Sequence, residues 1–337
     1  MNDESTNASI TTIKEAYKLV KPYINKTPVL TSKTINEIAS KNCGKNRQIY
    51  FKCENFQKVG AFKARGAINA VFRLSDSDAK KGVVTHSSGN HAQAIAYAAK
   101  LRKIPAHIVM PSNSPMVKKN AVEGYGAKIY LCEPTLDARE STTKRIMAET
   151  DSSFIHPYNN DNVISGQGTV FLEFVEQLRE KGVDIDTIIS PVGGGGLMSG
   201  VSISAKSYNK YINVIGAEPS GANDAFRSLE CGKLLAHSQG QPNTICDGLL
   251  TTLGSKTFQI IQKNVTKIIT IEDSYILKAM KLVWERMKII IEPSSAVPVA
   301  IALFSEEFKK LNAESIGIII SGGNVEIDTF PWSKSKF

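Results

Sequence analysis

Short apolar runs rich in β-branched residues alternate along the chain with longer segments of helical periodicity. The predicted strands are 49–52, 82–85, 107–110, 128–131, 187–190, 213–216 and 317–320. Between them, segments such as 91–101 and 164–181 carry apolar residues at i, i+3 and i+4, which predicts amphipathic helices. Because neighbouring parallel strands need a crossover segment, this alternation is typical of parallel sheets covered by helices. The sequence therefore predicts an α/β fold with twisted parallel sheets.

The length of the chain predicts two lobes. It has 337 residues, whereas a single hydrophobic core usually stops growing at about 250–300 residues. Apolar residues make up 42% and charged residues 22%, as in an ordinary globular protein. The longest apolar runs, such as 316–320, are far shorter than the roughly 20 residues that span a bilayer. No membrane partner is expected.

The N-terminal residues and the cysteines predict a cytoplasmic protein. Residues 1–7 are polar and acidic and lack the basic and apolar regions of a secretory signal. The cysteines form no Cys-x-x-Cys pair, so neither a disulfide framework nor a zinc site is expected. They are Cys43, Cys53, Cys132, Cys231 and Cys246.

The net charge of +9 raises the question of nucleic-acid binding. Nucleic-acid binders concentrate basic residues on one face, often with aromatic residues between them. Here the basic residues are dispersed, and 118–119 and 309–310 are only pairs. A basic surface also attracts small anionic molecules. Nucleic-acid binding is retained only as the alternative from a different functional class.

Small polar residues and glycine follow several predicted strands. These loops are 87–90, 193–196 and 321–324. In open α/β sheets, ligands bind at the carboxyl ends of the strands. The need for a tight turn would explain one such loop, but it explains three poorly. We therefore expect a ligand site where these strands end.

One of these loops contains Gly193, Gly194, Gly195 and Gly196, followed by Leu197 at the start of a predicted helix. Without Cβ atoms, consecutive backbone N–H groups can converge on an anion at a helix N-terminus, which favours a phosphate. The dinucleotide pattern G-x-G-x-x-G/A does not fit, because Met198 and Ser199 stand where it needs Gly or Ala. No nucleotide P-loop motif occurs in the chain.

A lysine at a predicted helix start is the candidate for covalent chemistry. Lys63 follows Phe62 within the segment 54–67. Most lysines in such positions extend to solvent. A desolvated lysine, however, has a lowered pKa and can form a Schiff base. A phosphate-binding loop, this lysine and an adjacent aromatic ring together suggest pyridoxal 5′-phosphate.

These motifs resemble those of the serine racemase and L-serine/L-threonine dehydratase family of fold-type II pyridoxal-phosphate enzymes. The match runs from about residue 26 to residue 324. It includes, in the family's order, the segments 57–67, 87–94, 166–169, 191–200 and 284–293. The resemblance implies the two-lobed fold of the tryptophan synthase β type, with the cofactor between the lobes.

The resemblance also implies the cofactor contacts. Lys63 would hold the cofactor as a Schiff base, and Phe62 would lie against its pyridine ring. Asn90 would hydrogen-bond the phenolic O3′, and the loop 193–197 would bind the phosphate through backbone N–H groups. Ser321 would face the pyridine nitrogen. A serine hydroxyl cannot keep that nitrogen protonated as a carboxylate would, which suits proton removal followed promptly by reprotonation or β-elimination.

For the substrate, the resemblance implies the loop of Ser87, Ser88, Gly89, Asn90 and His91. It would receive the carboxylate, with Arg139 as a closing contact. Lys63 would serve the si face of the planar intermediate, and Ser88 matches the re-face residue of the racemases. The Ser and Asn residues of this loop are also favoured at the N-cap of a helix. This structural role is compatible with substrate binding, because the free N–H groups of a helix N-terminus can bind a carboxylate. Tyr158 departs from the asparagine of the animal enzymes, so the preferred substrate side chain stays open.

A divalent cation site is expected after another strand. Glu218, the carbonyl of Ala222 and Asp224 match the cation site of serine racemases and offer hard oxygen ligands for Mg²⁺, Ca²⁺ or Mn²⁺. Without the resemblance, a solvated acidic turn would be the better interpretation.

A nucleotide activator is a further expectation from the resemblance. The animal enzymes bind ATP between subunits, and the corresponding residues are Lys58, Gln93, Tyr125, Lys288 and Asn324. Lys33 and Val59 depart from the nucleotide-binding pattern, which leaves activation by ATP open.

The resemblance thus implies an enzyme that racemises serine and also dehydrates it to pyruvate and ammonia. The alternative is a dedicated dehydratase for L-serine, L-threonine or threo-3-hydroxyaspartate. A large cofactor-binding domain is expected over 1–81 and 160–337, and a small mobile domain over 82–159. A homodimer is also expected.

Overall fold

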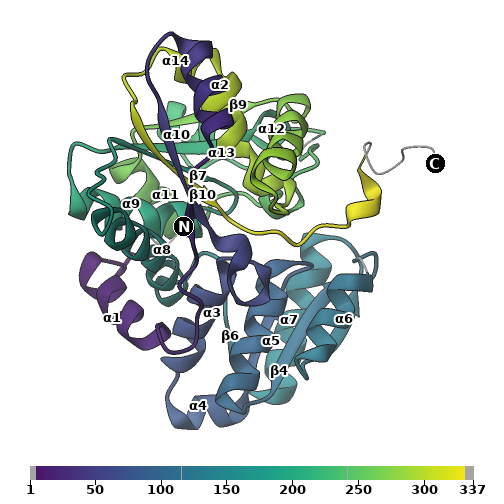
Figure 1. Cartoon of the computed structure of the whole chain (residues 1–337). Coiled ribbons are helices and arrows are strands. Elements are labelled where there is room, and N and C mark those ends of the chain that lie inside the picture. Colours follow the sequence, from purple (N-terminus) through teal and green to yellow (C-terminus); the bar gives the residue numbers. More distant parts are fainter. Residues whose placement is uncertain (1–4, 115, 241, 331–337) are drawn as a thin grey trace.

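The computed structural model describes residues 5–114, 116–240 and 242–330 and contains two β-sheets (Figure 1). The larger sheet has the strand order β1-β2-β10-β7-β8-β9, with every pairing parallel except that of β1 with β2. The smaller sheet has the order β5-β4-β3-β6 and is parallel throughout. This arrangement confirms the predicted α/β fold.

The larger sheet draws its strands from both ends of the sequence. They are β1 (Val29–Leu30), β2 (Gln48–Cys53), β7 (Thr187–Pro191), β8 (Asn213–Pro219), β9 (Lys267–Ile271) and β10 (Ser315–Ile320). The smaller sheet is continuous in sequence, with β3 (Val83–His86), β4 (Ala106–Pro111), β5 (Lys128–Cys132) and β6 (Ser153–Phe154). The smaller sheet therefore lies within the segment predicted as the small domain, whose boundaries and mobility stay predictions.

Helices accompany both sheets (Figure 1). Around the smaller sheet they are α4 (Asp76–Lys81), α5 (Asn90–Arg102), α6 (Met116–Gly124) and α7 (Leu136–Thr150). The remaining helices are α1 (Ile10–Val20), α2 (Lys33–Cys43), α3 (Lys63–Phe72), α8 (Asp161–Arg179), α9 (Gly196–Tyr208), α10 (Asp224–Cys231), α11 (Ser255–Asn264), α12 (Asp273–Met287), α13 (Pro293–Phe304) and α14 (Glu306–Lys309).

The larger sheet is covered on both faces, and this explains its apolar strands. Ile318 of β10 belongs to a buried cluster that includes residues of α2, α12 and α13. Its neighbour Ile319 belongs to a second cluster, which includes residues of α8, α9 and α11. Because successive side chains of a strand point to opposite faces, the two clusters lie on opposite sides of the sheet. A strand covered on both faces reads as a continuous apolar run.

Helix α3 contributes to the core beside the smaller sheet. Its residues Ala67, Ile68 and Val71 are fully buried in the apolar cluster that contains Ile95 of α5 and Ile108 of β4. Lys63 is the first residue of this helix. The predicted cofactor lysine therefore stands on a helix that packs against α5, beside the smaller sheet, and against α8.

The first turn of α3 is also anchored by a buried ionic cluster, formed by Lys52, Glu54, Arg65 and Glu173. Arg65 donates to both oxygens of Glu54, at 2.7 and 2.8 Å, and to Glu173 at 2.8 Å. Lys52 Nζ lies 2.6 Å from Glu173. Burial alone would raise the pKa of Glu173, but Arg65 and Lys52 hold this pKa below its usual value. Removing one member of such a cluster leaves a buried charge unpaired, which costs about 3–5 kcal/mol.

Candidate active site

Residues from both sheets line one cavity of about 480 Å³. A cavity of this size is in the range of small-molecule and cofactor sites. Every residue predicted for catalysis, for the cofactor or for the substrate lines it. They are Phe62, Lys63, Ser87, Ser88, Gly89, Asn90, His91, Arg139, Gly193, Gly194, Gly195, Gly196, Leu197 and Ser321. The structure thus brings these residues together, while the role of each stays a prediction.

Lys63 presents a partly buried amine to this cavity. Its Nζ donates a hydrogen bond of 2.8 Å to the carbonyl of Pro157 and lies 5.3 Å from the centre of the Phe62 ring. Burial lowers the pKa of Lys63 to about 8, even though the nearby Glu292 carboxylate raises it. At pH 7 a pKa of about 8 leaves roughly 10% of the amine neutral, against about 0.03% for an ordinary lysine. The amine is therefore prepared to attack a carbonyl carbon.

We expect the attachment of pyridoxal phosphate to the cofactor-free protein to follow this pKa. Only the neutral amine is nucleophilic, so the attachment rate should rise about tenfold for each pH unit below the pKa of about 8 and level off above it. In Glu292→Gln the levelling-off should move to lower pH, because the carboxylate raises the pKa of the lysine. The rate is measured by absorbance after mixing between pH 6 and 10. A rate that keeps rising to pH 10 in the unmodified protein would contradict the lowered pKa.

The glycine loop joins β7 to α9 and leaves bare backbone at the cavity. Gly195 has φ of +86°, a conformation that L side chains rarely adopt. A Cβ on Gly194 would lie 2.3 Å from a ring carbon of Tyr158, and one on Gly196 would lie 2.9 Å from the Tyr158 Cβ. The first N–H groups of α9 have no acceptor within their own helix and carry the positive end of its dipole. These residues fit a phosphate group.

Ser321 follows β10 on the cavity wall. Its hydroxyl lies 2.9 Å from that of Ser295, which donates to the carbonyl of Gly322 at 2.7 Å. Because the hydroxyl hydrogen of Ser295 is donated to the Gly322 carbonyl, the hydroxyl hydrogen of Ser321 can be donated either to Ser295 Oγ or to an acceptor in the cavity. This arrangement fits a neutral pyridine nitrogen, which accepts one hydrogen bond.

Glu292 is a site residue that the sequence analysis missed. It is buried, and its two oxygens accept from Asn90 Nδ2 at 3.0 and 3.1 Å. Burial, with a further contribution from Asp247, raises the pKa of Glu292 to about 7. A usable signal was present, since Glu292 is the one charged residue between Lys288 and Glu306, in a stretch that is otherwise uncharged and mostly apolar.

Asn90 is engaged from two sides in the structure. Besides its contact with Glu292, its Oδ1 accepts from Asn324 Nδ2 at 2.8 Å. One of the two Nδ2 hydrogens of Asn90 can be shared between both carboxylate oxygens of Glu292. The other Nδ2 hydrogen then stays available for the cofactor O3′. Its neighbours therefore already orient the Asn90 side chain, which fits its predicted role of binding the cofactor O3′.

The predicted substrate loop connects β3 to α5. Gly89 N donates to Ser87 Oγ at 3.2 Å, whereas Ser88 is exposed. His91 is buried, and burial holds its pKa well below the usual value, so its ring is neutral. Arg139 reaches the same cavity from the first turn of α7. The start of α5 and Arg139 together favour a carboxylate ligand.

Tyr158 occupies the side of the cavity next to the glycine loop. Its ring stands edge-on to His156 at 4.6 Å, and its backbone N–H donates to His156 Nδ1 at 3.2 Å. Burial raises the pKa of Tyr158 to about 12, so its hydroxyl keeps its proton. A bulky phenol therefore stands beside the glycine loop, at the position where the resemblance led us to expect an asparagine.

The predicted cation ligands lie at the end of β8 and the start of α10. Glu218 is fully buried and accepts from the backbone N–H groups of Ala225 and Phe226 at 3.0 and 2.8 Å. Asp224 Oδ2 accepts from Leu253 N at 3.0 Å. Burial raises the pKa of both carboxyls. Within 5–114, 116–240 and 242–330, no group of three or more His, Cys, Asp or Glu side chains is placed to hold a metal. A site here would need backbone oxygens such as that of Ala222.

The predicted nucleotide residues lie on several elements. Gln93 is buried on α5, and Tyr125 follows α6 with its ring 5.5 Å from that of Tyr97. Lys58 begins a short 3₁₀ helix, and Asn324 binds the carbonyl of the next residue, Val59, at 2.7 Å. Lys288 directly follows α12, and its Nζ donates to Glu285 O at 2.5 Å. The role of this set stays a prediction.

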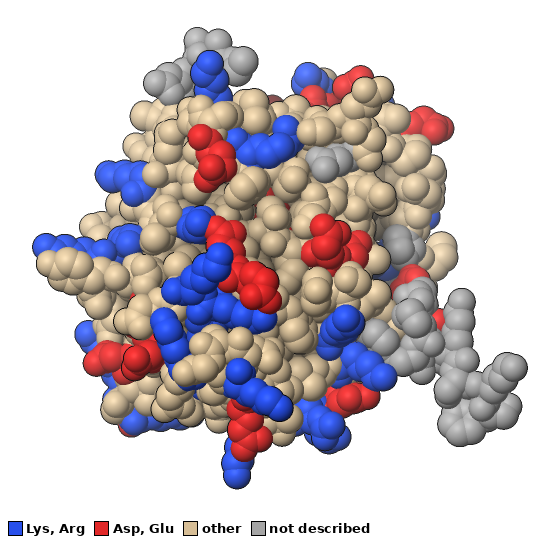
Figure 2. Space-filling model, turned by 90° about the horizontal axis from the view of Figure 1, so that it is seen from above, with Lys and Arg blue, Asp and Glu red and all other residues tan. Residues whose placement is uncertain are grey.

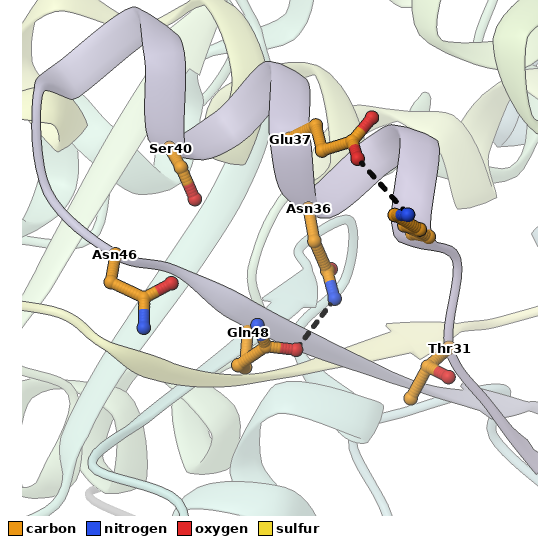
Figure 3. Close-up of a pocket in the computed structure, with 7 residues that line it drawn as sticks. Thr31, Asn36, Glu37, Ser40, Asn46 and Gln48 are labelled. Atoms are coloured by element: carbon orange, nitrogen blue, oxygen red, sulfur yellow. Dashed lines mark hydrogen bonds and ion pairs between the residues drawn. The ribbon is translucent and has the colours of Figure 1, made fainter.

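A second hollow, of about 580 Å³, lies beside α2 (Figure 3). Its polar side chains bind one another: Asn36 donates to Gln48 at 2.7 Å, and Lys33 lies 3.9 Å from Glu37. By contrast, the cavity around Lys63 combines shifted pKa values, a helix N-terminus and bare backbone. The features expected of an active site are therefore found in the cavity around Lys63 and not in the hollow beside α2.

Charges of both signs are mixed on one face of the molecule. On the face shown in Figure 2, Lys and Arg side chains lie next to Asp and Glu side chains. Such mixing lowers the net attraction for a polyanion. None of the helices in the described part of the chain has the length and apolar character needed to cross a membrane.

Comparisons with known proteins identify the family of this chain. A family model described as pyridoxal-phosphate dependent enzyme matches residues 20–322. Serine racemase from Dictyostelium discoideum is 54% identical over 318 residues, which cover 94% of this chain and 95% of the relative. The beta-hydroxyaspartate dehydratase of Paracoccus denitrificans is 45% identical and covers 94% of this chain and 96% of its own length.

Solved structures show the same fold. The crystal structure of serine racemase from Dictyostelium discoideum has a TM-score of 0.88 and 52% identity, and covers 95% of this chain and 99% of its own. A pyridoxal 5′-phosphate-dependent aspartate racemase has a TM-score of 0.90 and 36% identity, with coverage of 97% and 99%. These TM-scores and identities describe how similar this chain is to the two solved structures.

Proposed function

The chain belongs to the family of pyridoxal-phosphate-dependent enzymes, and from this membership we propose that it is a serine racemase that also dehydrates serine to pyruvate and ammonia. The observation that carries the proposal is the shared cavity, in which Lys63, Ser88 and the glycine loop face the same space. The relatives named above include a serine racemase at 54% identity, which favours this activity.

Different residues would hold different parts of the cofactor. The backbone at 193–197 would bind its phosphate, Phe62 would support its ring, and Lys63 would hold its aldehyde carbon. When bound, pyridoxal phosphate withdraws electrons from the Cα of an amino acid and makes the Cα proton removable. The substrate amine would take the place of Lys63 on the aldehyde carbon, and the freed Lys63 amine would then take or return that proton on one face.

Racemisation also needs a proton donor or acceptor on the second face. Ser88 would fill this role, assisted by its neighbours, because an ordinary hydroxyl is a poor base. Dehydration needs proton removal on one face only, followed by loss of the β-hydroxyl. The N–H groups at the start of α5, with Arg139, would hold the substrate carboxylate.

The second candidate is a dedicated dehydratase that acts on serine, threonine or 3-hydroxyaspartate. It is favoured by the 45% identity to a beta-hydroxyaspartate dehydratase, and Tyr158 leaves the preferred substrate side chain open. Purified protein incubated with L-serine, with D-serine and pyruvate measured together, decides between the two. D-serine formation supports the racemase, whereas pyruvate without D-serine supports the dehydratase.

We also propose that Glu218, the Ala222 carbonyl and Asp224 bind Mg²⁺, Ca²⁺ or Mn²⁺. An ion that binds only the folded state stabilises it by RT ln(1 + [L]/Kd), about 2.7 kcal/mol at 100 times Kd. Chelation should therefore lower the melting temperature, and added Mg²⁺ or Ca²⁺ should restore it. Asp224→Ala should melt at the same temperature with and without chelator. An unchanged melting curve of the unmodified protein in EDTA would count against the site.

A homodimer in the cytoplasm, with ATP as an activator, completes the proposal. The matches at Lys58, Gln93, Tyr125, Lys288 and Asn324 support a nucleotide site, while Lys33 and Val59 depart from its pattern. A rate measurement with and without ATP tests the activation, and the mass in solution tests the homodimer.

A further inference from the structure

Thr257 is a fully buried residue in the first turn of α11, and its hydroxyl reaches the glycine loop. Thr257 Oγ1 donates a hydrogen bond of 2.8 Å to the carbonyl of Gly194. It also accepts from Gly254 N at 2.9 Å, which is a usual contact at the start of a helix. The Gly254 carbonyl lies 3.1 Å from the same hydroxyl, but it already accepts from Phe258 N at 2.9 Å. The hydroxyl hydrogen is therefore directed to Gly194.

The bond from Thr257 fixes the orientation of the peptide group between Gly194 and Gly195. In a trans peptide the C=O and the N–H point in opposite directions. With its carbonyl held by Thr257, this peptide presents the N–H of Gly195 on the opposite side. Gly194 and Gly195 line the cavity that contains Lys63, whereas Thr257 is not part of its lining. The N–H of Gly195 is therefore turned toward the cavity.

The glycine loop depends on its neighbours for this orientation, because glycine by itself permits many backbone conformations. Thr257 packs against Gly195, where an added Cβ would lie 2.8 Å from the Thr257 Cβ. Tyr158 covers Gly194, where an added Cβ would lie 2.3 Å from the ring Cδ1. These contacts confine the loop, but they do not select the direction in which its polar groups point. The Thr257 hydroxyl makes that selection.

The same turn of α11 is bound to the segment that contacts Lys63. Asn159 Oδ1 accepts from Lys256 N at 2.9 Å, and Asn159 Nδ2 donates to Ser255 Oγ at 3.2 Å. Two residues before Asn159, the carbonyl of Pro157 accepts from Lys63 Nζ at 2.8 Å. The start of α11 therefore connects the loop predicted to bind the phosphate with the segment that contacts the predicted cofactor lysine.

We propose that Thr257 is a positioning residue for the cofactor phosphate, which acts by turning the N–H of Gly195 toward the phosphate oxygens. The inference rests on the cofactor site proposed above and adds to it a residue outside the cavity lining. A hydrogen bond to a charged group contributes more than one between neutral groups, so the direction of a single N–H affects phosphate affinity strongly. A ligand without a phosphate gains nothing from this orientation.

The test compares pyridoxal phosphate with pyridoxal, which has the same ring and aldehyde but no phosphate. Each is titrated into the full-length protein after removal of its cofactor, and binding is followed by visible absorbance. Thr257→Val keeps the shape of the side chain and removes the hydroxyl. It should weaken the binding of pyridoxal phosphate by about 10- to 100-fold and that of pyridoxal by less than about threefold. Thr257→Ser retains the hydroxyl and should bind both ligands within about threefold of the unmodified protein.

The matched control is Thr85→Val. Thr85 is equally buried in β3, and its hydroxyl donates to the carbonyl of Ile155 at 2.8 Å. This variant loses a comparable hydrogen bond away from the glycine loop, so the ratio of the two affinities should stay unchanged. Phosphorus magnetic resonance of the holoenzyme gives a second readout. Because N–H donors favour the phosphate dianion, the titration midpoint of the bound phosphate should be higher in Thr257→Val than in the unmodified protein.

The outcomes separate this inference from the proposed function. If Thr257→Val weakens both ligands equally, or neither, the role of Thr257 is overturned while the cofactor site stands. If the unmodified protein binds pyridoxal phosphate no more tightly than pyridoxal, the inference fails together with the assignment of the phosphate to the glycine loop. If it binds neither ligand, the proposed function fails as well. Should Thr257→Val not fold, Thr257→Ala takes its place, and the same loss of preference for the phosphorylated ligand is expected.

Discussion

Lys63→Ala should lose racemisation and dehydration together, each by at least about 10³-fold, because both reactions need the same proton removed at Cα. General acid–base catalysis alone contributes about 10²–10⁴ in rate, and this substitution also removes the covalent hold on the cofactor. The measurement is D-serine and pyruvate formation from L-serine at saturating cofactor. Borohydride treatment followed by mass spectrometry should find the cofactor on the peptide that contains Lys63 in the unmodified protein and nowhere in the variant.

The matched control for this substitution is Lys80→Ala. Lys80 is an exposed lysine of α4 and does not line the cavity. It should keep both activities and the covalent label on Lys63. The assignment of Lys63 is wrong if Lys63→Ala retains the label, or if it makes pyruvate at an unchanged rate.

Ser88→Ala should separate the two reactions. Loss of the second proton-transfer group should reduce D-serine formation by about 10²–10⁴-fold, while pyruvate formation from L-serine continues within a few-fold. The reason is that elimination needs proton removal on one face only. Both products are measured in one reaction mixture, and the visible spectrum of the bound cofactor should be unchanged.

Ser87→Ala is a control in the same loop. It removes a hydroxyl one residue away and, with it, the 3.2 Å hydrogen bond from Gly89 N. Because this bond shapes the loop that would hold the carboxylate, both products should fall to the same degree, mainly through a higher KM. Undiminished D-serine formation in Ser88→Ala would show that another group or water serves the second face. If the unmodified protein makes no D-serine, the dehydratase is the correct assignment.

The parallel sheets could be predicted because their strands are continuous apolar runs. The prediction 317–320, for example, lies within β10 (Ser315–Ile320). β9 (Lys267–Ile271) was missed, although it is also rich in isoleucine, because polar residues interrupt it at an edge of the sheet. β1 and β6 have two residues each, which is too short for any period to show. Their pairing depends on neighbours distant in sequence.

The cofactor part of the site was accessible from sequence because each of its pieces is a contiguous motif at the end of a strand. The contacts that complete it are not contiguous. Glu292 meets Asn90 from 202 positions away, and Lys118 pairs with Asp247 on another element. Thr257 reaches Gly194 from 63 positions away. Such pairs become visible only when the packing brings them together.

The ionic cluster beneath α3 has a consequence for the order of assembly. Lys52 and Glu173 are 121 positions apart, and Arg65 and Glu173 are 108 apart. A partly assembled cluster would hold a dehydrated charge without its partner, so intermediates with half the cluster are disfavoured. Contacts of such long range also form slowly, because the loop entropy must be lost before they stabilise the chain. We therefore expect the turn that carries Lys63 to become ordered only after α8 has docked. A nascent or partly unfolded chain would not capture pyridoxal phosphate at this lysine until that step is complete.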